Sequence, residues 1–434
     1  MSICPPCYWL SEPLREIQRQ EADVNIDNLD LNEDSLLPLI LGTGFNDPYP
    51  VYDHLRSACP VHRDASGIWL VSPHALVTRI LDDRNFSARP PSPMLAAEDP
   101  LGYLGMVVFE TGDQHERLRR LLAPLFTRKR LADLQQFIDA EILRLLAPLR
   151  QTKRFDLIAD VARVLPVRTI CHLLGFPESA ARTYLKASMG AWRLISAASL
   201  STEERAQAVD ETRRFLDQIE SFVAEVDSDK TPDHPILYFR QLEESGDVDH
   251  GSMLANILFL FIAGYGTTLL SIGNSVAAAM RHPETWQALC GDCALIPQAA
   301  RELQRYDPAV QAIFRYAWKD VEVGDQLIRR GEQVALLLGA ANRDPDEFAL
   351  PNNIDLYRTR GRSLTFGAGP HSCMGLALAR MQLESLLREL PRHMPDLTLS
   401  GADNYRLQRG AFHGFSQLLL DHSVITDRHS ANST

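Results

Sequence analysis

A short stretch of the chain, FGAGPHSCMG at 366–375, holds one cysteine among glycines and other small residues. Gly367, Gly369 and Gly375 can adopt positive φ values, or let the backbone approach a neighbour closely, where other residues resist. A loop of this kind presents the Cys373 thiol to a partner. The thiol could be inert in a turn, act as a nucleophile, or bind a metal.

The sequence after the loop favours the metal ligand among these three roles. GLALARMQLESLLREL, which starts at Gly375, has the apolar spacing of an amphipathic helix. The thiolate then lies at a helix N-terminus, where free N–H groups and the dipole stabilise negative charge. His371 could activate a nucleophilic cysteine, but two residues so close in a tight loop rarely align, and no Asn or Asp that would orient the base is evident.

The pattern F-G-x-G-x-H-x-C-x-G, from Phe366 to Gly375, resembles the haem-binding loop of the cytochrome P-450 superfamily. The resemblance implies that Cys373 is the proximal thiolate ligand of the iron in haem b, which pushes electron density onto the iron and favours O–O cleavage. It also implies that backbone N–H groups of the loop bond the sulfur and that Phe366 packs beside it.

Several cationic residues occur in the order that the family has them. The resemblance assigns His115 and Arg119, in DQHERLRR, to the haem propionates, together with Arg315 and His371. Buried carboxylates need cationic or hydrogen-bonding partners, which these side chains supply. Taken singly, each is an ordinary histidine or arginine, so their joint order carries the interpretation.

Glu302 and Arg305, in RELQRYDP, are three residues apart and share a face of a predicted helix. Such pairs are common on surfaces, so their position along the chain decides their meaning. In the family a helical ExxR precedes the cysteine and joins an arginine of the intervening meander, which Arg358 matches here. The resemblance implies a structural lock beneath the haem, in which three buried charges satisfy one another.

The apolar helix predicted at about 251–280 contains AGYGTT at 263–268. Ala263 and Thr267 lie one turn apart on one face, and Gly264 lacks a side chain where dioxygen would need room. From the residues alone, this is a core helix with small residues for close packing. The resemblance implies the oxygen-binding helix of the family, with Thr267 hydrogen-bonding dioxygen and helping to deliver protons.

Gly266 departs from the family pattern, which usually has Asp or Glu immediately before the threonine. A carboxylate at this position relays protons for O–O cleavage, and a glycine cannot. Three hypotheses follow: a monooxygenase whose protons arrive through water, the substrate or another side chain; oxidation in several steps with carbon–carbon cleavage; and peroxide-driven chemistry.

The composition of the 434 residues, with 45% hydrophobic and 23% charged, is ordinary for a globular protein with a large core. A net charge of −12 argues against nucleic acid as a partner, because phosphate binding needs a basic surface. The N-terminal residues lack the basic start and apolar region of a signal peptide, and the longest apolar stretch, 254–270, is too interrupted for a membrane span. We expect a cytoplasmic monomer without membrane contact.

Seven scattered cysteines fit a reducing compartment better than a disulfide scaffold. They include the pairs Cys4–Cys7 and Cys290–Cys293. Two such pairs could in principle form a zinc site, but no histidine pattern accompanies them. Reduced, unpaired thiols are the simpler interpretation.

Apolar residues at spacings of three and four dominate from His115 onward and predict helices. Strand signals are short, and we expect a short helix followed by paired strands within 49–73, a hairpin-like pair at 321–339 and a small sheet near 404–422. The predicted fold class is mainly α with small β-sheets, the cytochrome P-450 fold, with haem between the oxygen-binding helix and the cysteine-loop helix. The predicted domains are an N-terminal extension at 1–44, one large domain at 45–425 and a C-terminal tail at 426–434.

No convincing Gly-rich dinucleotide motif or flavin-binding region occurs, so electrons from NAD(P)H would arrive through a ferredoxin reductase and a ferredoxin. A basic cluster near the proximal face of the family offers a dock for an acidic ferredoxin, although such runs are also common on solvated faces. The cluster consists of Arg117, Arg120, Arg128, Lys129 and Arg130.

Family analogy predicts a substrate pocket lined by apolar side chains, namely Met94, Leu101, Leu104, Val107, Phe314 and Phe412. Such a lining suits an apolar substrate, such as a terpenoid or polyketide of secondary metabolism, that the enzyme would hydroxylate or epoxidise with O₂. A fatty acyl group or a carrier-bound amino acid would suit the same lining. Other haem-thiolate reactions (isomerisation, peroxygenation, phenol coupling), a non-catalytic haem sensor or carrier, and a non-haem Cys/His hydrolase are the alternatives.

Overall fold

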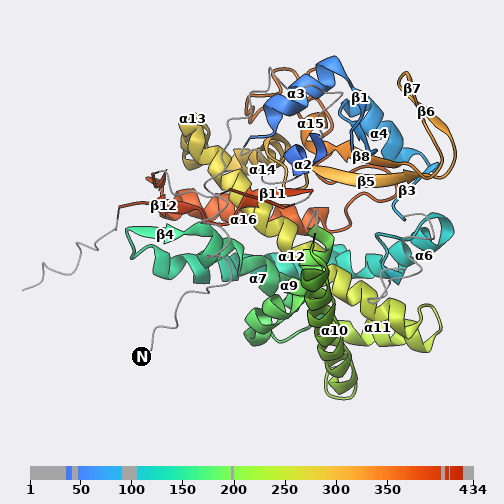
Figure 1. The fold of residues 1–434 in the computed structure, drawn as a ribbon. Helices are drawn as coiled ribbons and strands as arrows, with labels where there is room; N and C mark the ends of the chain where they lie inside the picture. The colour runs from blue at the N-terminus through green and yellow to red at the C-terminus, as the bar shows by residue number, and fades with distance from the viewer. Residues whose placement is uncertain are drawn as a thin grey trace, which may run out of the picture.

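Helices make up most of the computed structural model, which describes residues 36–41, 47–89, 105–196, 200–401, 406–409 and 411–423 (Figure 1). The first helices are α2 (Leu36–Leu41), α3 (Tyr49–Ala58), α4 (His74–Asp82), α6 (Gly112–Leu122), α7 (Arg128–Leu149), α8 (Leu165–Leu174) and α9 (Ala181–Ser196). The later ones are α10 (Thr202–Glu225), α11 (Pro235–Glu244), α12 (His250–Arg281), α13 (Pro283–Gly291), α14 (Ile296–Tyr306), α15 (Leu338–Ala341) and α16 (Leu376–His393).

Short strands form small sheets around this helical body. One sheet has the strand order β1 (Val61–Arg63), β2 (Trp69–Val71), β8 (Gln333–Leu337), β5 (Ala312–Ala317) and β3 (Phe86–Ser87), with β2 and β8 parallel and the other pairs antiparallel. A second has the order β4 (Arg154–Asp156), β12 (Leu419–Asp421) and β9 (Thr398–Leu399). Two antiparallel pairs complete the set: β6 (Val321–Val323) with β7 (Gln326–Ile328), and β10 (Arg406–Arg409) with β11 (Phe412–Phe415).

Helix α12 runs through the centre of the fold. It begins after Asp249, whose carboxylate accepts the Ser252 N–H, and it ends where Pro283 follows. It packs on α8, α9, α14, α16 and β11, so most of its side chains are buried. Among the helices of the described ranges it is the one long and apolar enough to cross a membrane by length and composition, but 72% of its apolar window is buried. The predicted core helix is confirmed.

Figure 1 shows the five-stranded sheet with α3, α4 and α15 on one side of α12, and α7, α9, α10 and α11 on the other. The largest buried cluster joins α12 to α7, α8 and α16, while two smaller clusters lie on the two faces of the five-stranded sheet. Helix α2 buries Leu36 and Ile40 in one of these, so part of the predicted N-terminal extension packs on the domain. The boundary at 44/45 stays a prediction.

The secondary-structure predictions agree with the structure in outline. The helix and paired strands within 49–73 are α3, β1 and β2, and the mainly α fold class is confirmed. The region 321–339 holds the hairpin β6–β7, but β8 leaves it for the larger sheet. The small sheet near 404–422 is divided between β10–β11 and β12. Which strands pair depends on distant residues, which local patterns do not specify.

Candidate functional site

The cysteine loop folds as a tight approach to α16. Gly367 and Gly369 have φ of +68° and +66°, which side-chain-bearing residues rarely adopt, and a Cβ at Gly369 would overlap the Leu81 carbonyl oxygen. The Cys373 N–H donates to the Phe366 carbonyl at 2.9 Å and closes the loop. These glycines therefore do what the sequence predicted, and the thiol projects two residues before the N-cap of α16.

The Cys373 thiol is accessible, although protein atoms surround it on most sides. Desolvation raises its pKa, whereas the backbone N–H of Gly375, which bonds the sulfur, and the positive charge of Arg119 lower it. These two neighbours favour the thiolate once another positive charge, such as a metal, compensates for desolvation. The Phe366 ring lies under the Arg380 guanidinium, 5.4 Å from its carbon. Its packing beside the sulfur stays a prediction.

The four predicted cationic residues converge beside this loop. His115 of α6 stacks on His371 with ring centroids 3.9 Å apart, and Arg119 Nη1 donates to the Ser372 carbonyl at 2.7 Å. Arg315 of β5 is buried and donates to the Phe314 carbonyl. Burial, and then the charges of Arg315, His115 and Arg119, lower the pKa of His371 to about 3.

The two guanidinium groups of this set suit an anionic ligand, and the imidazoles can add hydrogen bonds. Within the described ranges no carboxylate forms an ion pair with Arg119 or Arg315, and burial lowers the pKa of Arg315 to about 10. A buried guanidinium without a carboxylate destabilises the fold unless a ligand supplies the negative charge. The two propionates of haem, next to an accessible thiol held at a helix N-terminus, match both halves of the donor set. The residues present therefore fit haem.

Glu302, Arg305 and Arg358 meet in the interior as predicted. Arg305 donates twice to the Glu302 carboxylate, both at 2.8 Å, and Arg358 Nε lies 3.1 Å from both carboxylate oxygens. Burial by itself raises the pKa of Glu302, but the bonds from Arg305 and the Asp355 N–H bring it below its usual range. Arg305 also donates to three carbonyls of the 342–353 segment. The three side chains thus join α14 to the segment 342–358, the meander of the sequence analysis.

Ala263 and Thr267 share a face of α12, and the Thr267 hydroxyl donates to the Ala263 carbonyl at 2.7 Å. Gly264 flanks this face, and a Cβ there would overlap Cδ1 of Ile170 on α8. The missing side chain therefore allows α12 to approach α8. The room for dioxygen that we predicted at Gly264 stays a prediction. No sequence pattern within α12 reveals which helix lies against it.

Gly266 flanks the same face on its other side. A Cβ there would overlap the six-membered ring of Trp192, from α9, at atoms Cζ3, Cη2 and Cε3. Trp192 in turn contacts Phe412 of β11, with ring centroids 4.9 Å apart. Sequence reasoning missed Trp192, although a glycine where the family has an acid was a signal that a bulky neighbour takes the space.

Strand alternation corrects one predicted substrate contact. Phe314 and Arg315 are adjacent in β5, so they point to opposite faces of the sheet. Phe314 packs with the cluster around α3, whereas Ile313, on the face of Arg315, packs with the other cluster. Arg315 lies close enough to His371 to lower its pKa, so this face of β5 adjoins the site. Ile313 therefore replaces Phe314 as the candidate beside the site.

Val107 is buried against α12, and Asn256 holds it there. The Asn256 Oδ1 accepts the Val107 N–H at 2.9 Å, and Nδ2 donates to the carbonyls of Gly105 and Ser252. We predict that Asn256→Leu, which leaves Gly105 and Val107 backbone groups unpaired, lowers the free energy of unfolding by about 2–4 kcal/mol. Hydrogen exchange at Val107 should accelerate in this variant, whereas Asn256→Asp keeps that acceptor and should protect Val107. Unchanged exchange in Asn256→Leu would contradict the anchoring role.

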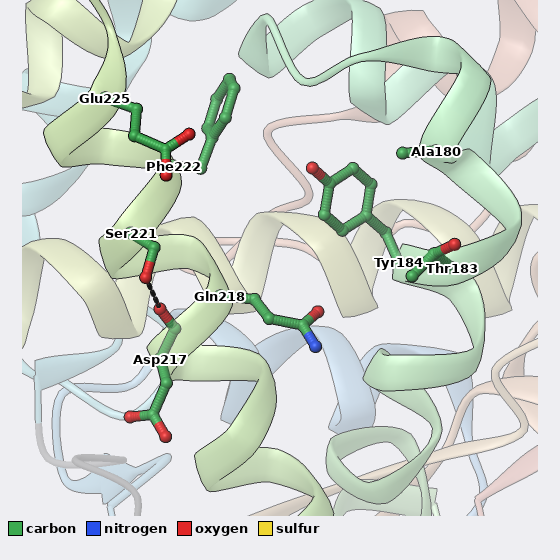
Figure 2. Close-up of a pocket in the computed structure, with 8 residues that line it drawn as sticks. All are labelled: Ala180, Thr183, Tyr184, Asp217, Gln218, Ser221, Phe222 and Glu225. Atoms are coloured by element: carbon green, nitrogen blue, oxygen red, sulfur yellow. Dashed lines mark hydrogen bonds between the residues drawn. The ribbon is translucent and has the colours of Figure 1, made fainter.

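The remaining predicted pocket residues, Met94, Leu101 and Leu104, lie outside the described residues. A separate hollow of about 410 Å³ opens at the surface between α9 and α10 (Figure 2). It is lined by Ala180, Thr183, Tyr184, Asp217, Gln218, Ser221, Phe222 and Glu225, and Figure 2 shows Tyr184 facing the Phe222 and Glu225 side chains across it. Its lining includes none of the predicted site residues.

The predicted basic cluster lies on α6 and the start of α7. Arg120, Arg128 and Lys129 are exposed, and no ion pair joins them to another described residue. Arg117 lies 3.5 Å from Asp247, and Arg130 is half-buried. Because Arg119 of the same helix reaches Ser372, this surface adjoins the cysteine loop.

Comparison with known proteins gives the family. A family model described as Cytochrome P450 matches residues 192–393. The chain is 32% identical over 390 residues to the putative cytochrome P450 133B1 of Xylella fastidiosa (strain 9a5c), covering 86% of this chain and 96% of that relative. The chain belongs to the cytochrome P450 family. The predicted resemblance is confirmed.

Other members share its length and architecture. The biotin biosynthesis cytochrome P450 of Bacillus subtilis (strain 168) is 31% identical over 365 residues, which cover 82% of this chain and 91% of that relative. The solved structure of P450BioI, in complex with acyl carrier protein ligated to hexadec-9Z-enoic acid, matches with a TM-score of 0.81 at 28% identity, over 87% of this chain and 98% of that one. The protein is thus a cytochrome P450 monooxygenase with the cytochrome P450 fold, and haem is its cofactor.

Proposed function

We infer that this cytochrome P450 hydroxylates or epoxidises an apolar small molecule, of terpenoid or polyketide character, in secondary metabolism, as a cytoplasmic monomer. The observation that carries this inference is the apolar surround of the Ala263–Thr267 face, where Trp192 and Phe412 contact each other beside Gly266. Apolar side chains favour substrates that gain by leaving water. The similar P450BioI was solved with a fatty acid on its carrier, which agrees with an apolar ligand.

Haem, when bound, supplies the oxidative chemistry: one oxygen atom of O₂ enters the substrate and the other leaves as water, with two electrons and two protons. Cys373 would ligate its iron. The propionates would lie among Arg119, Arg315, His115 and His371, which place hydrogen-bond donors beside the loop.

Thr267 is the group of this chain that can hold a proton close to the reacting oxygen. Its hydroxyl donates to Ala263, so its lone pairs remain able to accept a proton or a hydrogen bond from water. With Gly266 in place of the usual acid, protons would reach Thr267 through water. Of the three hypotheses for this position, we propose the ordinary monooxygenase.

The function is tested by reconstitution with a ferredoxin, its reductase and NAD(P)H, using apolar compounds that shift the Soret band of the purified protein. We expect a product that carries one oxygen atom from isotopically labelled O₂. Turnover with hydrogen peroxide alone at the same rate would favour the peroxide-driven alternative. A carbon–carbon cleavage product would favour oxidation in several steps. Binding without any turnover would favour a sensor or carrier.

The exposed basic cluster supports docking of a ferredoxin. The chain as a whole carries a net charge of −12. The exposed and unpaired Arg120, Arg128 and Lys129 therefore form a locally positive surface that would attract an acidic partner. Arg119 of the same helix bonds the cysteine loop, so a donor docked on this helix would lie near Cys373. Docking here would bring the donor to the thiolate side of the haem.

We predict that Arg120→Glu combined with Lys129→Glu raises the KM for ferredoxin about tenfold or more, because steering charges change association rates by such factors. Substrate affinity should stay unchanged, and the rate should lose most of its dependence on ionic strength. The matched control is Arg213→Glu on α10, which is exposed and whose helix packs on α9, α11 and α12. Equal KM values for both variants would place the docking surface elsewhere.

A further inference from the structure

Gly266 and Trp192 form one packing unit. The benzene edge of the indole lies where the side chain of residue 266 would begin, so any larger residue there must displace the ring or the helix. Gly266 is buried, and nothing in its backbone requires a glycine, since it lies within the continuous helix α12. A glycine inside a helix is less favourable than an alanine, so its presence needs a packing reason. The indole is that reason.

Phe412 of β11 continues this unit on the side of Trp192. Its ring lies 4.9 Å from that of Trp192 with an interplanar angle of 47°, so the two rings are tilted and do not cover each other's faces. Its backbone forms an antiparallel bridge with Val310, in the segment that leads into β5 and Arg315. Gly414, two residues on, contacts Leu270 of α12. Both rings are only partly buried, although they pack against the main cluster.

The position of this pair relative to Thr267 follows from helix geometry. Successive residues of an α-helix turn by about 100°, so Gly266 lies beside the Ala263–Thr267 face and not behind it. The indole that packs on Gly266 therefore rises along the edge of that face. A substrate held over Thr267 would therefore lie beside the indole.

We propose that Trp192 determines the substrate specificity of this enzyme: with Phe412 it forms an aromatic wall beside Thr267 that binds a flat, unsaturated ring, and Gly266 is the glycine that admits the indole. This inference rests on the proposed oxidation of an apolar substrate and narrows its class. Rings tilted at 47° leave faces on which a third ring can stack or meet an edge. The indole of Trp192 is held in place by its contact with Gly266 of α12, so its side chain loses little further freedom when a ligand binds. A saturated ring of the same skeleton is thicker and lacks a π-face.

The packing unit is tested first by thermal unfolding of the protein as purified. Gly266→Ala should lower the unfolding midpoint of the native sequence, because the added methyl group overlaps the indole. In a Trp192→Ala background the same change should leave the midpoint equal or raise it, because alanine favours the helix. Equal shifts in the two backgrounds would overturn the packing unit. This measurement needs neither substrate nor turnover.

The wall is tested by measuring how tightly naphthalene and decalin, its saturated counterpart, bind to the haem-loaded enzyme. The shift of the Soret band and calorimetry both report this binding. We expect naphthalene to bind more tightly, and Trp192→Ala to reduce that preference about two- to tenfold, the range expected for one aromatic contact. Trp192→Phe should retain most of it, and Gly266→Ala should reduce it without contacting the probe. The matched control is Trp318→Ala, which removes a tryptophan whose surface is 52% exposed.

Two results would overturn the proposal: an unchanged preference in Trp192→Ala, or no binding of either probe to the native enzyme. Failure of the proposed function is distinguishable from both. Should naphthalene bind with the expected preference while no ferredoxin-driven oxidation occurs with any compound, the aromatic wall stands and the proposed reaction fails.

Discussion

Replacing Glu302 with alanine is expected to lower the free energy of unfolding by about 3–5 kcal/mol, because it leaves two buried guanidinium groups without their carboxylate. Arg305 and Arg358 both bond Glu302, and the side chains of all three are at most 8% exposed. Water cannot solvate the charges that remain. Urea unfolding followed by circular dichroism, on haem-free and haem-loaded protein, measures the loss.

The matched control is Asp320→Ala, which removes the ion pair with Arg329. That pair has the same 2.8 Å separation, but its side chains are 50% and 64% exposed, so its loss should change stability by less than about 1 kcal/mol. A second variant tests the origin of the effect: replacing all three buried charges with apolar residues should recover much of the stability that Glu302→Ala loses. A loss below about 1 kcal/mol in Glu302→Ala would contradict the structural lock.

Replacing Arg315 with methionine is expected to change haem retention and haem-free stability in opposite directions. Arg315 is buried, and within the described ranges it has no carboxylate partner, so removing its charge should leave the haem-free protein equally stable or more stable. Haem should be lost about 10–100 times more readily, since a hydrogen bond to a charged group contributes about 1.5–3 kcal/mol. Transfer of haem to an acceptor protein, timed by absorbance, measures retention.

Arg330→Met provides the comparison for this second prediction. Arg330 is exposed, near β7, and its removal should alter neither property. If Arg315→Met destabilised the haem-free protein and left haem transfer unchanged, Arg315 would be a structural residue and the anion site would have to lie elsewhere. Loss of both would indicate a general folding defect.

Local sequence patterns predicted the parts of the site that lie close together in the chain. The loop from Phe366 to Cys373 and the pair Glu302–Arg305 depend on turns and helical spacing, and the structure has them as expected. Apolar periodicity likewise placed α12. The joining of Arg358 to Glu302 came from the family resemblance and not from spacing, because no local rule brings a meander to a helix.

The errors arose where distant elements meet. Phe314 was placed in the pocket wrongly, because the face of β5 that meets the site is set by pairing with β8, which local sequence does not show. The packing of Gly264 against Ile170 was not predicted, because Ile170 lies on another helix and cannot be located from the sequence around Gly264. Trp192 was missed for the same reason. Aromatic and glycine pairs of this kind become visible only when two helices are in place.

The measurement that tests the account most directly is the carbon monoxide difference spectrum of the reduced protein. We expect the strongly red-shifted Soret band of thiolate-ligated haem, its loss in Cys373→Ser, and its retention in Cys293→Ser, which alters another exposed thiol. The same spectrum in Cys373→Ser as in the native protein, or no such band in the native protein, would contradict the assignment of Cys373 as the iron ligand.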